Sequence, residues 1–309
     1  MIKFEGLTKR FKSTEAVSEL RLTIEDKEIF GLLGPNGAGK TTTLLMLCSI
    51  MKPTKGTIIL NGINIVQNPD EGRRNLGIAF QEPVLDSRLT VEQNLEFHAE
   101  ACRLTRTERR ERIDAILGYL DMSNSRKQKV GSLSGGMKKK IENAKIFIQR
   151  PPIAIFDEPT AYLDVPSRHR VWKEIENLKQ GGSTVILATN MMDEAERLAN
   201  RLGILTKGKL VAMGTTGYLK DSIPQGDVID LQVTGDPTPV AQIIRQIERV
   251  REVVIVPQTN RLRIYLAQAE LRLPEIMETL IGKGTRVESI AVREPSLDDV
   301  FLHYAGEAL

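Results

Sequence analysis

Short apolar runs in the first two thirds of the chain predict strands that alternate with helices. The run at residues 29–33 is apolar throughout, as in a strand that is buried on both faces of a sheet. A glycine-rich turn follows it, and residues 41–51 then have helical character. Similar runs predict further strands at residues 57–60, 76–80, 153–156, 184–188 and 202–205. These elements predict an α/β core around a mostly parallel sheet.

Two changes of pattern divide the rest of the chain. Over residues 88–150 the strand signals vanish and apolar residues fall at helical spacings, which predicts an inserted helical subdomain. Near residue 220 a stretch punctuated by glycine and proline predicts a domain boundary. We therefore expect a core domain over residues 1–220 and a smaller accessory domain over residues 221–309.

The accessory domain has its own order of elements. Strand, helix, strand, strand, helix and strand are predicted at residues 228–233, 240–250, 253–256, 262–266, 276–283 and 287–292. This βαββαβ order is that of the ferredoxin-like fold.

Composition and charge exclude several classes of protein. The 309 residues suffice for about two domains, and 41% hydrophobic with 27% charged residues argues against disorder. A net charge of +3 gives no reason to expect nucleic acid as a partner. Two cysteines without paired spacing argue against a disulfide framework and favour a reducing compartment. Because no apolar stretch approaches the ~20 residues of a membrane span, any work at a membrane requires a separate spanning partner.

The glycine-rich turn is the first sign of chemistry. It matches the pattern G-x-x-x-x-G-K-S/T between a buried strand and a helix, as a phosphate-binding loop requires. Backbone N–H groups surround the phosphates, while Lys40 supplies a positive charge and the Thr41 hydroxyl can bind Mg²⁺. A chance glycine turn is the alternative, but it does not explain the flanking strand and helix. The predicted nucleotide-binding residues are Gly34, Pro35, Asn36, Gly37, Ala38, Gly39, Lys40, Thr41 and Thr42.

Two carboxylates follow the apolar run at residues 153–156. Asp157 and Glu158 would lie at the carboxyl edge of a parallel sheet, where open α/β folds bind their ligands. Asp157 is expected to hold Mg²⁺, and Glu158 to polarise a water that attacks the γ-phosphate. The alternative is an ordinary acidic turn after a strand.

A second potential anion site precedes a helix. The Ser134 hydroxyl and the close approach permitted by Gly135 and Gly136 could bring helix N-terminal amides to a phosphate. Alternatively the three residues form only a capped turn. The lysines at residues 138–140 are expected to form a solvated helix face.

In this order, the motifs resemble those of the ATP-binding subunits of ABC transporters. Gln81 after a strand and the pair Leu163-Asp164 complete the resemblance over residues 1–220. The Leu-Ser-Gly-Gly signature ends in Met137 rather than Gln, which is similar to the drug-exporter branch that includes daunorubicin-resistance subunits. The tail at residues 294–302, Glu-Pro-Ser-Leu-Asp-Asp-Val-Phe-Leu, is similar to the end of the small domain of those subunits.

The resemblance implies a P-loop NTPase core of the ABC ATPase type that uses ATP and Mg²⁺. It implies that Gln81 contacts Mg²⁺ or the attacking water and relays the nucleotide state to the helical insertion. It places Phe11 where the family stacks a Tyr on adenine, although a Phe packed in the core is the alternative. Ser134, Gly135 and Gly136 would close over ATP held by a second cassette. Leu163 and Asp164 would lie along the seam, which is the interface between the two cassettes.

The resemblance also implies partners and a location. We expect a head-to-tail homodimer of cassettes that drives a separate transmembrane permease subunit. The chain would then work at the cytoplasmic side of the cell membrane, peripherally and through that subunit.

Two residues depart from the family pattern. Asn190 stands where the family has a His that contacts the γ-phosphate, and an amide carries neither charge nor a titratable proton there. Tyr162 replaces a small residue at the seam, and packing is the simplest role for it. The three histidines, His98, His169 and His303, lie in predicted helices outside the motifs and are not expected to replace the missing one.

Three functions remain open from these residues. The first is an ATP-hydrolysing subunit of a membrane exporter. The second is a slow or non-hydrolytic cassette, in which Asn190 limits hydrolysis and ATP serves chiefly to hold the dimer together. The third, a soluble ABC ATPase of DNA repair or translation, fits less well, since those proteins usually have coiled-coil insertions or tandem cassettes.

Overall fold

The computed structural model describes residues 1–222, 227–248, 250–266, 269–293 and 295–305. They form two compact units, Met1–Met213 and Gly214–Leu309. Glu294 of the predicted tail motif lies outside the described residues.

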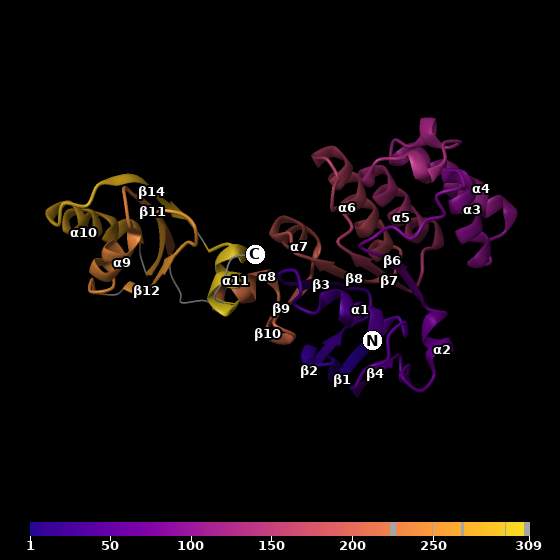
Figure 1. The fold of residues 1–309 in the computed structure, drawn as a ribbon, viewed down its shortest axis with the longest axis horizontal. Coiled ribbons are helices and arrows are strands. Elements are labelled where there is room, and N and C mark those ends of the chain that lie inside the picture. Colours follow the sequence, from indigo (N-terminus) through magenta and orange to yellow (C-terminus); the bar gives the residue numbers. More distant parts are fainter. Residues whose placement is uncertain (223–226, 249, 267–268, 294, 306–309) are drawn as a thin grey trace. The chain divides into compact units, whose positions relative to one another are not determined.

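The first unit is built on a six-stranded sheet of order β10-β9-β3-β8-β7-β6 (Figure 1). Its strands are β3 (Ile29–Leu33), β6 (Leu76–Ala79), β7 (Ile153–Asp157), β8 (Thr184–Thr189), β9 (Arg201–Thr206) and β10 (Lys209–Gly214). Strands β9, β3, β8, β7 and β6 run parallel to one another, so their carboxyl ends share one edge. The predicted α/β core is confirmed.

Both faces of this sheet are covered, which explains strands that are apolar throughout. On β7, Ala154 and Phe156 enter one core, while Ile153 and Ile155 enter another. The first core is shared with α3 (Val91–Ala101), α4 (Arg106–Tyr119), α5 (Gly135–Gln149), α6 (Val165–Gln180) and α7 (Met192–Leu198). The second is shared with α1 (Lys40–Leu47) and an antiparallel sheet of β2 (Thr14–Ile24), β1 (Ile2–Phe11), β4 (Lys55–Leu60) and β5 (Ile63–Asn64).

Local sequence signals explain the helical insertion between β6 and β7. Thr90 caps α3 in a reciprocal box with Gln93, and Thr105 caps α4 in the same way with Glu108. Two 3₁₀ turns, Ser123–Ser125 and Val130–Ser132, then lead into α5. A short helix, α2 (Pro69–Arg73), precedes β6.

The second unit has the predicted βαββαβ order and a sheet of order β12-β13-β11-β14. Its elements are α8 (Thr216–Ser222), β11 (Asp227–Val233), α9 (Pro237–Ile244), β12 (Val250–Ile255), β13 (Arg261–Leu266), α10 (Ala269–Gly282), β14 (Val287–Arg293) and α11 (Leu297–Ala305). The helix predicted over residues 240–250 is wrong at both ends. Asp236 caps α9 ahead of Pro237, and Val250 pairs with Leu266 in the sheet.

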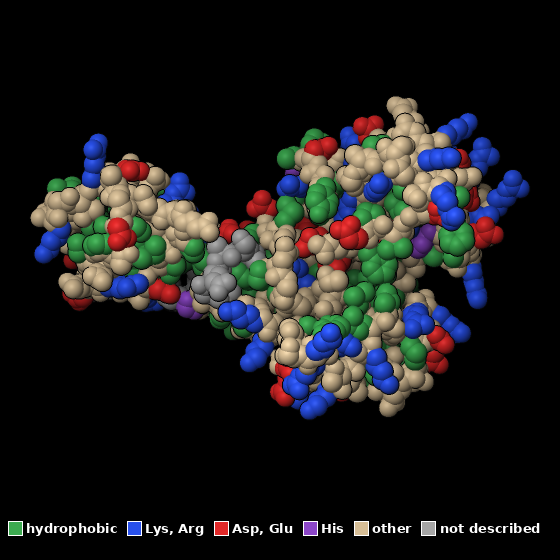
Figure 2. Space-filling model, in the orientation of Figure 1, with side chains coloured by type: hydrophobic (Ala, Val, Ile, Leu, Met, Phe, Trp, Pro, Cys, Tyr) green, Lys and Arg blue, Asp and Glu red, His purple; other side chains and the backbone are tan. Residues whose placement is uncertain are grey.

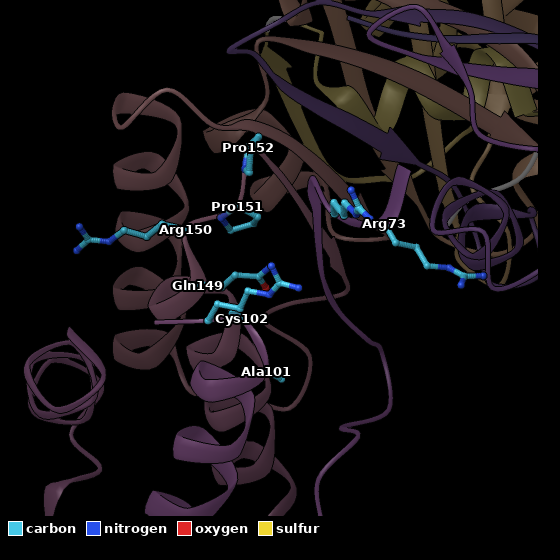
Figure 3. Close-up of a pocket in the computed structure, with 9 residues that line it drawn as sticks. Arg73, Ala101, Cys102, Gln149, Arg150, Pro151 and Pro152 are labelled. Atoms are coloured by element: carbon cyan, nitrogen blue, oxygen red, sulfur yellow. The ribbon is translucent and has the colours of Figure 1, made fainter. Parts of the chain in front are cut away.

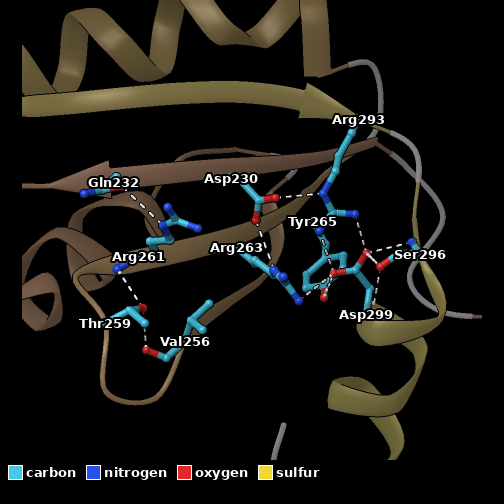
Figure 4. Close-up of polar contacts among 10 residues, drawn as sticks. All are labelled: Asp230, Gln232, Val256, Thr259, Arg261, Arg263, Tyr265, Arg293, Ser296 and Asp299. Atoms are coloured by element: carbon cyan, nitrogen blue, oxygen red, sulfur yellow. Dashed lines mark hydrogen bonds and ion pairs between the residues drawn. The ribbon is translucent and has the colours of Figure 1, made fainter. Parts of the chain in front are cut away.

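A buried ionic network joins α11 to this sheet (Figure 4). Asp299 is fully buried and accepts from the Nη1 and Nη2 atoms of Arg293, at 2.5 and 2.9 Å, and pairs with Arg263 at 3.1 Å. Burial alone would raise the pKa of Asp299, but Arg293 and Ser296 hold it below its usual value. The tail motif therefore has a structural role, which is to fix α11 on the sheet.

Candidate nucleotide-binding site

The loop between β3 and α1 has a backbone that only glycine permits at two points. Gly39 has φ +104°, and a Cβ there would lie 2.4 Å from the carbonyl oxygen of Ala16. A Cβ at Gly34 would lie 2.4 Å from the carbonyl oxygen of Leu205. The glycines of the motif thus allow the loop to pack closely while it turns into the helix.

Lys40 is the first residue of α1 and is almost fully buried. Its ammonium donates to the carbonyl oxygens of Gly34 at 2.6 Å and Pro35 at 3.1 Å. Burial lowers the pKa of Lys40, and the nearby carboxylates of Glu158 and Asp157 counteract this. The positive charge is therefore held over the loop itself.

Asp157 lies at the end of β7, facing the start of α1. Its Oδ2 accepts a hydrogen bond of 2.7 Å from the Thr41 hydroxyl, whereas the buried Oδ1 has no partner among the described residues. Burial raises the pKa of Asp157, and the bond from Thr41 counteracts this. A hydroxyl beside a carboxylate with a free oxygen fits Mg²⁺, which takes its remaining ligands from phosphate and water.

Glu158 and Gln81 meet across the ends of two neighbouring strands. The Gln81 amide donates to Glu158 Oε2 at 3.2 Å, and the Glu158 backbone N–H donates to the Ala188 carbonyl at 2.8 Å. Glu158 has φ +48°, an uncommon conformation for a side chain of this size. Both residues line a cavity of about 290 Å³ together with Ala16, Pro35, Asn36, Gly37, Gly39, Lys40, Thr41 and Thr42.

Several predicted site residues are not among those that line this cavity, and they include Gly34, Ala38, Asp157, Asn190 and Phe11. Asn190 directly follows β8, whose Thr189 pairs with Leu33, so it lies at the same edge of the sheet. Phe11 ends β1 with 43% of its surface exposed and with the Lys9 ammonium 5.1 Å from its ring centroid. The alternative of a Phe packed in the core is therefore wrong.

The Leu-Ser-Gly-Gly signature forms the start of α5. Ser134 caps the helix by accepting a hydrogen bond of 3.3 Å from the Met137 backbone N–H. A Cβ at Gly136 would lie 2.9 Å from the Tyr162 carbonyl oxygen, whereas nothing lies within 4 Å of one at Gly135. None of the signature residues lines the cavity of the same chain.

The residues predicted to lie at the seam differ in how far they are buried in their own chain. Leu163 packs into the core of its own chain, and Asp164 caps α6 by accepting from Ser167 N–H at 2.8 Å. Tyr162 is 77% exposed and has φ +66°, so the prediction that it packs is wrong.

The prediction of a solvated lysine face at residues 138–140 is wrong for Lys139. This residue is fully buried, and Lys140 donates to the Leu120 carbonyl oxygen at 3.3 Å. Glu142 and Asn143 are also fully buried. The sequence carries no signal of this burial, because charged residues at helical spacing normally form an exposed face.

Sequence reasoning also missed a buried contact behind Asn190. Glu194 on α7 accepts hydrogen bonds from the Thr160 hydroxyl at 2.7 Å and the Trp172 indole at 3.0 Å. Burial raises the pKa of Glu194, and these bonds counteract the shift. The segment after β8 is therefore anchored to the loop that follows Glu158.

A larger hollow, of about 670 Å³, lies beside Pro151, at the amino end of β7 (Figure 3). Arg73 and Arg150 line it but extend in different directions, and Arg73 pairs with Asp70 at 3.2 Å. In the view of Figure 2, Lys and Arg side chains spread around the outside of the first unit with Asp and Glu among them. We assign no site to this hollow, because Arg73 and Arg150 do not converge on it.

Comparisons with known proteins agree with the motifs. A family model described as "ABC transporter" matches residues 17–161, and one described as "ATP-binding protein DrrA1-3-like, C-terminal domain" matches residues 214–305. The daunorubicin resistance ATP-binding protein DrrA2 of Streptomyces coeruleorubidus is 32% identical over 99% of this chain and 95% of its own. The linearmycin resistance ATP-binding protein LnrL of Bacillus subtilis is 30% identical over 100% of this chain and 99% of its own.

Solved structures show the same relationship. The ATP-binding subunit of an ABC transporter has a TM-score of 0.67 and 28% identity, over 71% of this chain and 92% of its own. A dimeric ATP-binding cassette in a post-hydrolysis state, bound to ADP and phosphate, has a TM-score of 0.65 and 26% identity, over 70% of this chain and 98% of its own. The chain belongs to the ABC transporter family, as an ATP-binding subunit of the drug-resistance exporter type.

Proposed function

We propose that this chain hydrolyses Mg²⁺-ATP between two copies of itself and thereby drives a separate transmembrane export subunit. ABC ATPases generally hydrolyse ATP, and one similar structure holds ADP and phosphate. The observation that carries the proposal is the meeting of Lys40, Thr41, Asp157, Gln81 and Glu158 at one edge of the sheet.

Each residue at this edge has a chemical role. The loop amides and the Lys40 ammonium bind the phosphates, while Thr41 and Asp157 would hold Mg²⁺. When bound, Mg²⁺ neutralises charge on the phosphoryl oxygens. Glu158 orients and polarises the attacking water, and Gln81 fixes Glu158 through their hydrogen bond.

A second copy is needed because each chain has two half-sites. The signature at Ser134 lies outside the cavity of its own chain. In a head-to-tail dimer, Ser134, Gly135 and Gly136 of one copy face the phosphates bound by the other, with helix N-terminal amides as donors. The dimeric form of a similar cassette supports this arrangement. We propose a homodimer.

A groove beside Gln81 is suited to the transmembrane subunit. It has a volume of about 650 Å³, and its lining includes the exposed side chains of Val84 and Phe97. Val84 follows Gln81 by three residues, so a displacement of Val84 by a bound partner is transmitted along this short loop to the hydrogen bond between Gln81 and Glu158. Among the described residues no helix is long and apolar enough to cross a membrane. We propose that a cytoplasmic segment of the permease docks in this groove and holds the chain at the cytoplasmic face of the membrane.

Asn190 sets the expected rate. An amide donates one neutral hydrogen bond to a γ-phosphate oxygen where a His can donate a charged one. The loss of a charge-assisted contact from this transition state costs about 2–4 kcal/mol, or roughly 30- to 1,000-fold in rate. A slow cassette that uses ATP chiefly to close the dimer is therefore the second candidate.

Turnover of Mg²⁺-ATP against protein concentration separates the two candidates. The native chain is compared with Asn190→His, and Glu158→Gln serves as the blank. For a hydrolysing homodimer we expect native turnover well above the blank, rising faster than linearly with concentration. Native turnover equal to the blank and restored by Asn190→His would instead establish the slow cassette.

The groove is tested with a matched pair of exposed apolar residues. Phe97 in the groove and Leu271 in the second unit are each 73% exposed. Phe97→Ser should abolish stimulation of turnover by the permease and leave basal turnover unchanged, while Leu271→Ser should leave both unchanged. Equal stimulation of the two variants would contradict docking at this groove.

A further inference from the structure

Lys139 is a buried cation at the junction of the two half-sites. Its ammonium donates to the carbonyl oxygens of Phe80 at 2.9 Å, Gln81 at 3.1 Å and Asp157 at 2.9 Å. These acceptors lie at or just beyond the carboxyl ends of β6 and β7, where the sheet ladder no longer provides donors. Three N–H donors thus meet three acceptors, which satisfies the ammonium completely.

Glu142, one turn further along α5, holds the same loop from its other end. Its Oε1 accepts from the Phe80 N–H at 3.2 Å, and its Oε2 accepts from the Val84 N–H at 2.9 Å. Lys145 pairs with Glu142 at 2.9 Å and donates to the Val84 carbonyl oxygen at 3.1 Å. Side chains of helix α5 are therefore hydrogen-bonded to both ends of the loop at residues 80–84, which carries Gln81.

The same helix begins with the signature. Ser134 and Lys139 are five residues apart, or about 7.5 Å along a helix at ~1.5 Å per residue. Hydrogen-bonded helices are stiff over this length, so a displacement at Ser134 also moves the ammonium of Lys139.

The position of Lys139 is electrostatically costly. A buried charge is tolerated only when it is paired and fully hydrogen-bonded. Burial lowers the pKa of Lys139 to about 8, and the charges of Asp157 and Glu142 counteract this. An apolar side chain at this position would leave three carbonyl groups without this donor.

We propose that Lys139 is a positioning residue that fixes the Gln81 backbone against Asp157 and couples it to the signature helix. When Ser134 of one chain closes over the nucleotide bound by the partner copy, Gln81 and Glu158 of that same chain are then aligned in the site that they line. This inference rests on the proposed role of Gln81 in hydrolysis.

A double-mutant cycle between Lys139 and Gln81 tests the coupling. In the full chain, Lys139→Met should lower kcat for Mg²⁺-ATP at least ~10-fold and change KM less than ~2-fold, because phosphate binding by the loop is retained. In a Gln81→Ala background, the same substitution should lower kcat by less than ~2-fold further. Lys140→Met, which removes a neighbouring charge on the same helix, should leave kcat within ~2-fold of the native value.

The outcomes separate this inference from the proposed function. If Gln81→Ala alone leaves kcat unchanged, the proposed role of Gln81 fails. If Lys139→Met lowers kcat by the same factor in both backgrounds, Lys139 does not act through Gln81 and the inference is overturned. Lys139→Gln, which keeps one amide donor, repeats the cycle if the Met variant does not fold. Failure of both variants to fold would overturn the inference too, because Lys139 would then be required by the fold alone.

Discussion

Acid should destabilise the first unit through His98 on α3. This histidine is largely buried, and its Nε2 lies 3.6 Å from the Cys102 sulfur. Burial, together with the charge of Lys145, lowers the pKa of His98 from 6.5 to about 4, although hydrogen bonds with Gln149 and Lys145 counteract part of the shift. The folded chain therefore keeps this imidazole neutral at pH values at which the unfolded chain protonates it.

The size of the effect follows from linkage. Between pH 6.5 and 4 the unfolded state binds more protons than the folded state, so the free energy of unfolding falls as the pH falls. A shift of about 2.5 pKa units corresponds to about 3 kcal/mol in full. Integration from pH 8 to pH 5 gives a loss of about 2 kcal/mol.

The assay uses the chain's one tryptophan, Trp172, which packs in the same core as α3. Denaturant unfolding is followed by its fluorescence at pH 8 and pH 5, for the native chain and for His98→Gln. Between pH 8 and pH 5, the free energy of unfolding should fall by about 2 kcal/mol more for the native chain than for His98→Gln. His303→Gln, in the second unit, is the matched control and should behave as the native chain does.

The comparison of variants removes the contribution of the carboxyl groups, which titrate in all three proteins. If the native chain and His98→Gln lose equal free energy between pH 8 and pH 5, burial does not hold this imidazole neutral. The reasoning would be refuted in the same way if His303→Gln abolished the difference.

Three further predictions concern other parts of the chain. Gly39→Ala should raise the Kd for ATP at least ~10-fold in a nucleotide titration, because φ +104° and the contact with the Ala16 carbonyl oxygen forbid a side chain; unchanged affinity would contradict this. Asp299→Asn should destabilise the second unit by about 3 kcal/mol in denaturant followed by circular dichroism, since it removes the buried negative charge that Arg293 and Arg263 share, and a change below ~1 kcal/mol would argue against the network. Glu194→Gln should become more stable than the native chain as the pH rises above 4.5, because burial raises the pKa of the carboxyl group and ionising it costs free energy; an equal pH dependence would exclude that cost.

The sequence alone predicted the elements whose signals are local. The apolar runs that became β3, β7 and β8 have side chains buried on both faces, so neither face shows polar alternation. The P-loop was recognisable because each of its parts acts within nine residues, from Gly34 to Thr42. The order of motifs likewise identified the family, since order is a property of the chain itself.

The accessory domain shows where local signals become weak. Its βαββαβ order was predictable from alternating short runs, but the end of α9 was not. Val250 continues the apolar spacing of the helix, and only its pairing with Leu266 places it in a strand. Tertiary pairing overrode local propensity there.

Only the tertiary structure decided which distant groups meet. Thr41 and Asp157 share a hydrogen bond across 116 residues, and Gln81 and Glu158 across 77, because parallel strands bring their carboxyl ends to one edge. In the sequence, Lys139 cannot be distinguished from the lysines on either side of it, since its burial depends on how α5 is rotated against the ends of β6 and β7. Local spacing determined the chemistry available to this chain, whereas strand order and helix rotation determined which of those groups act together.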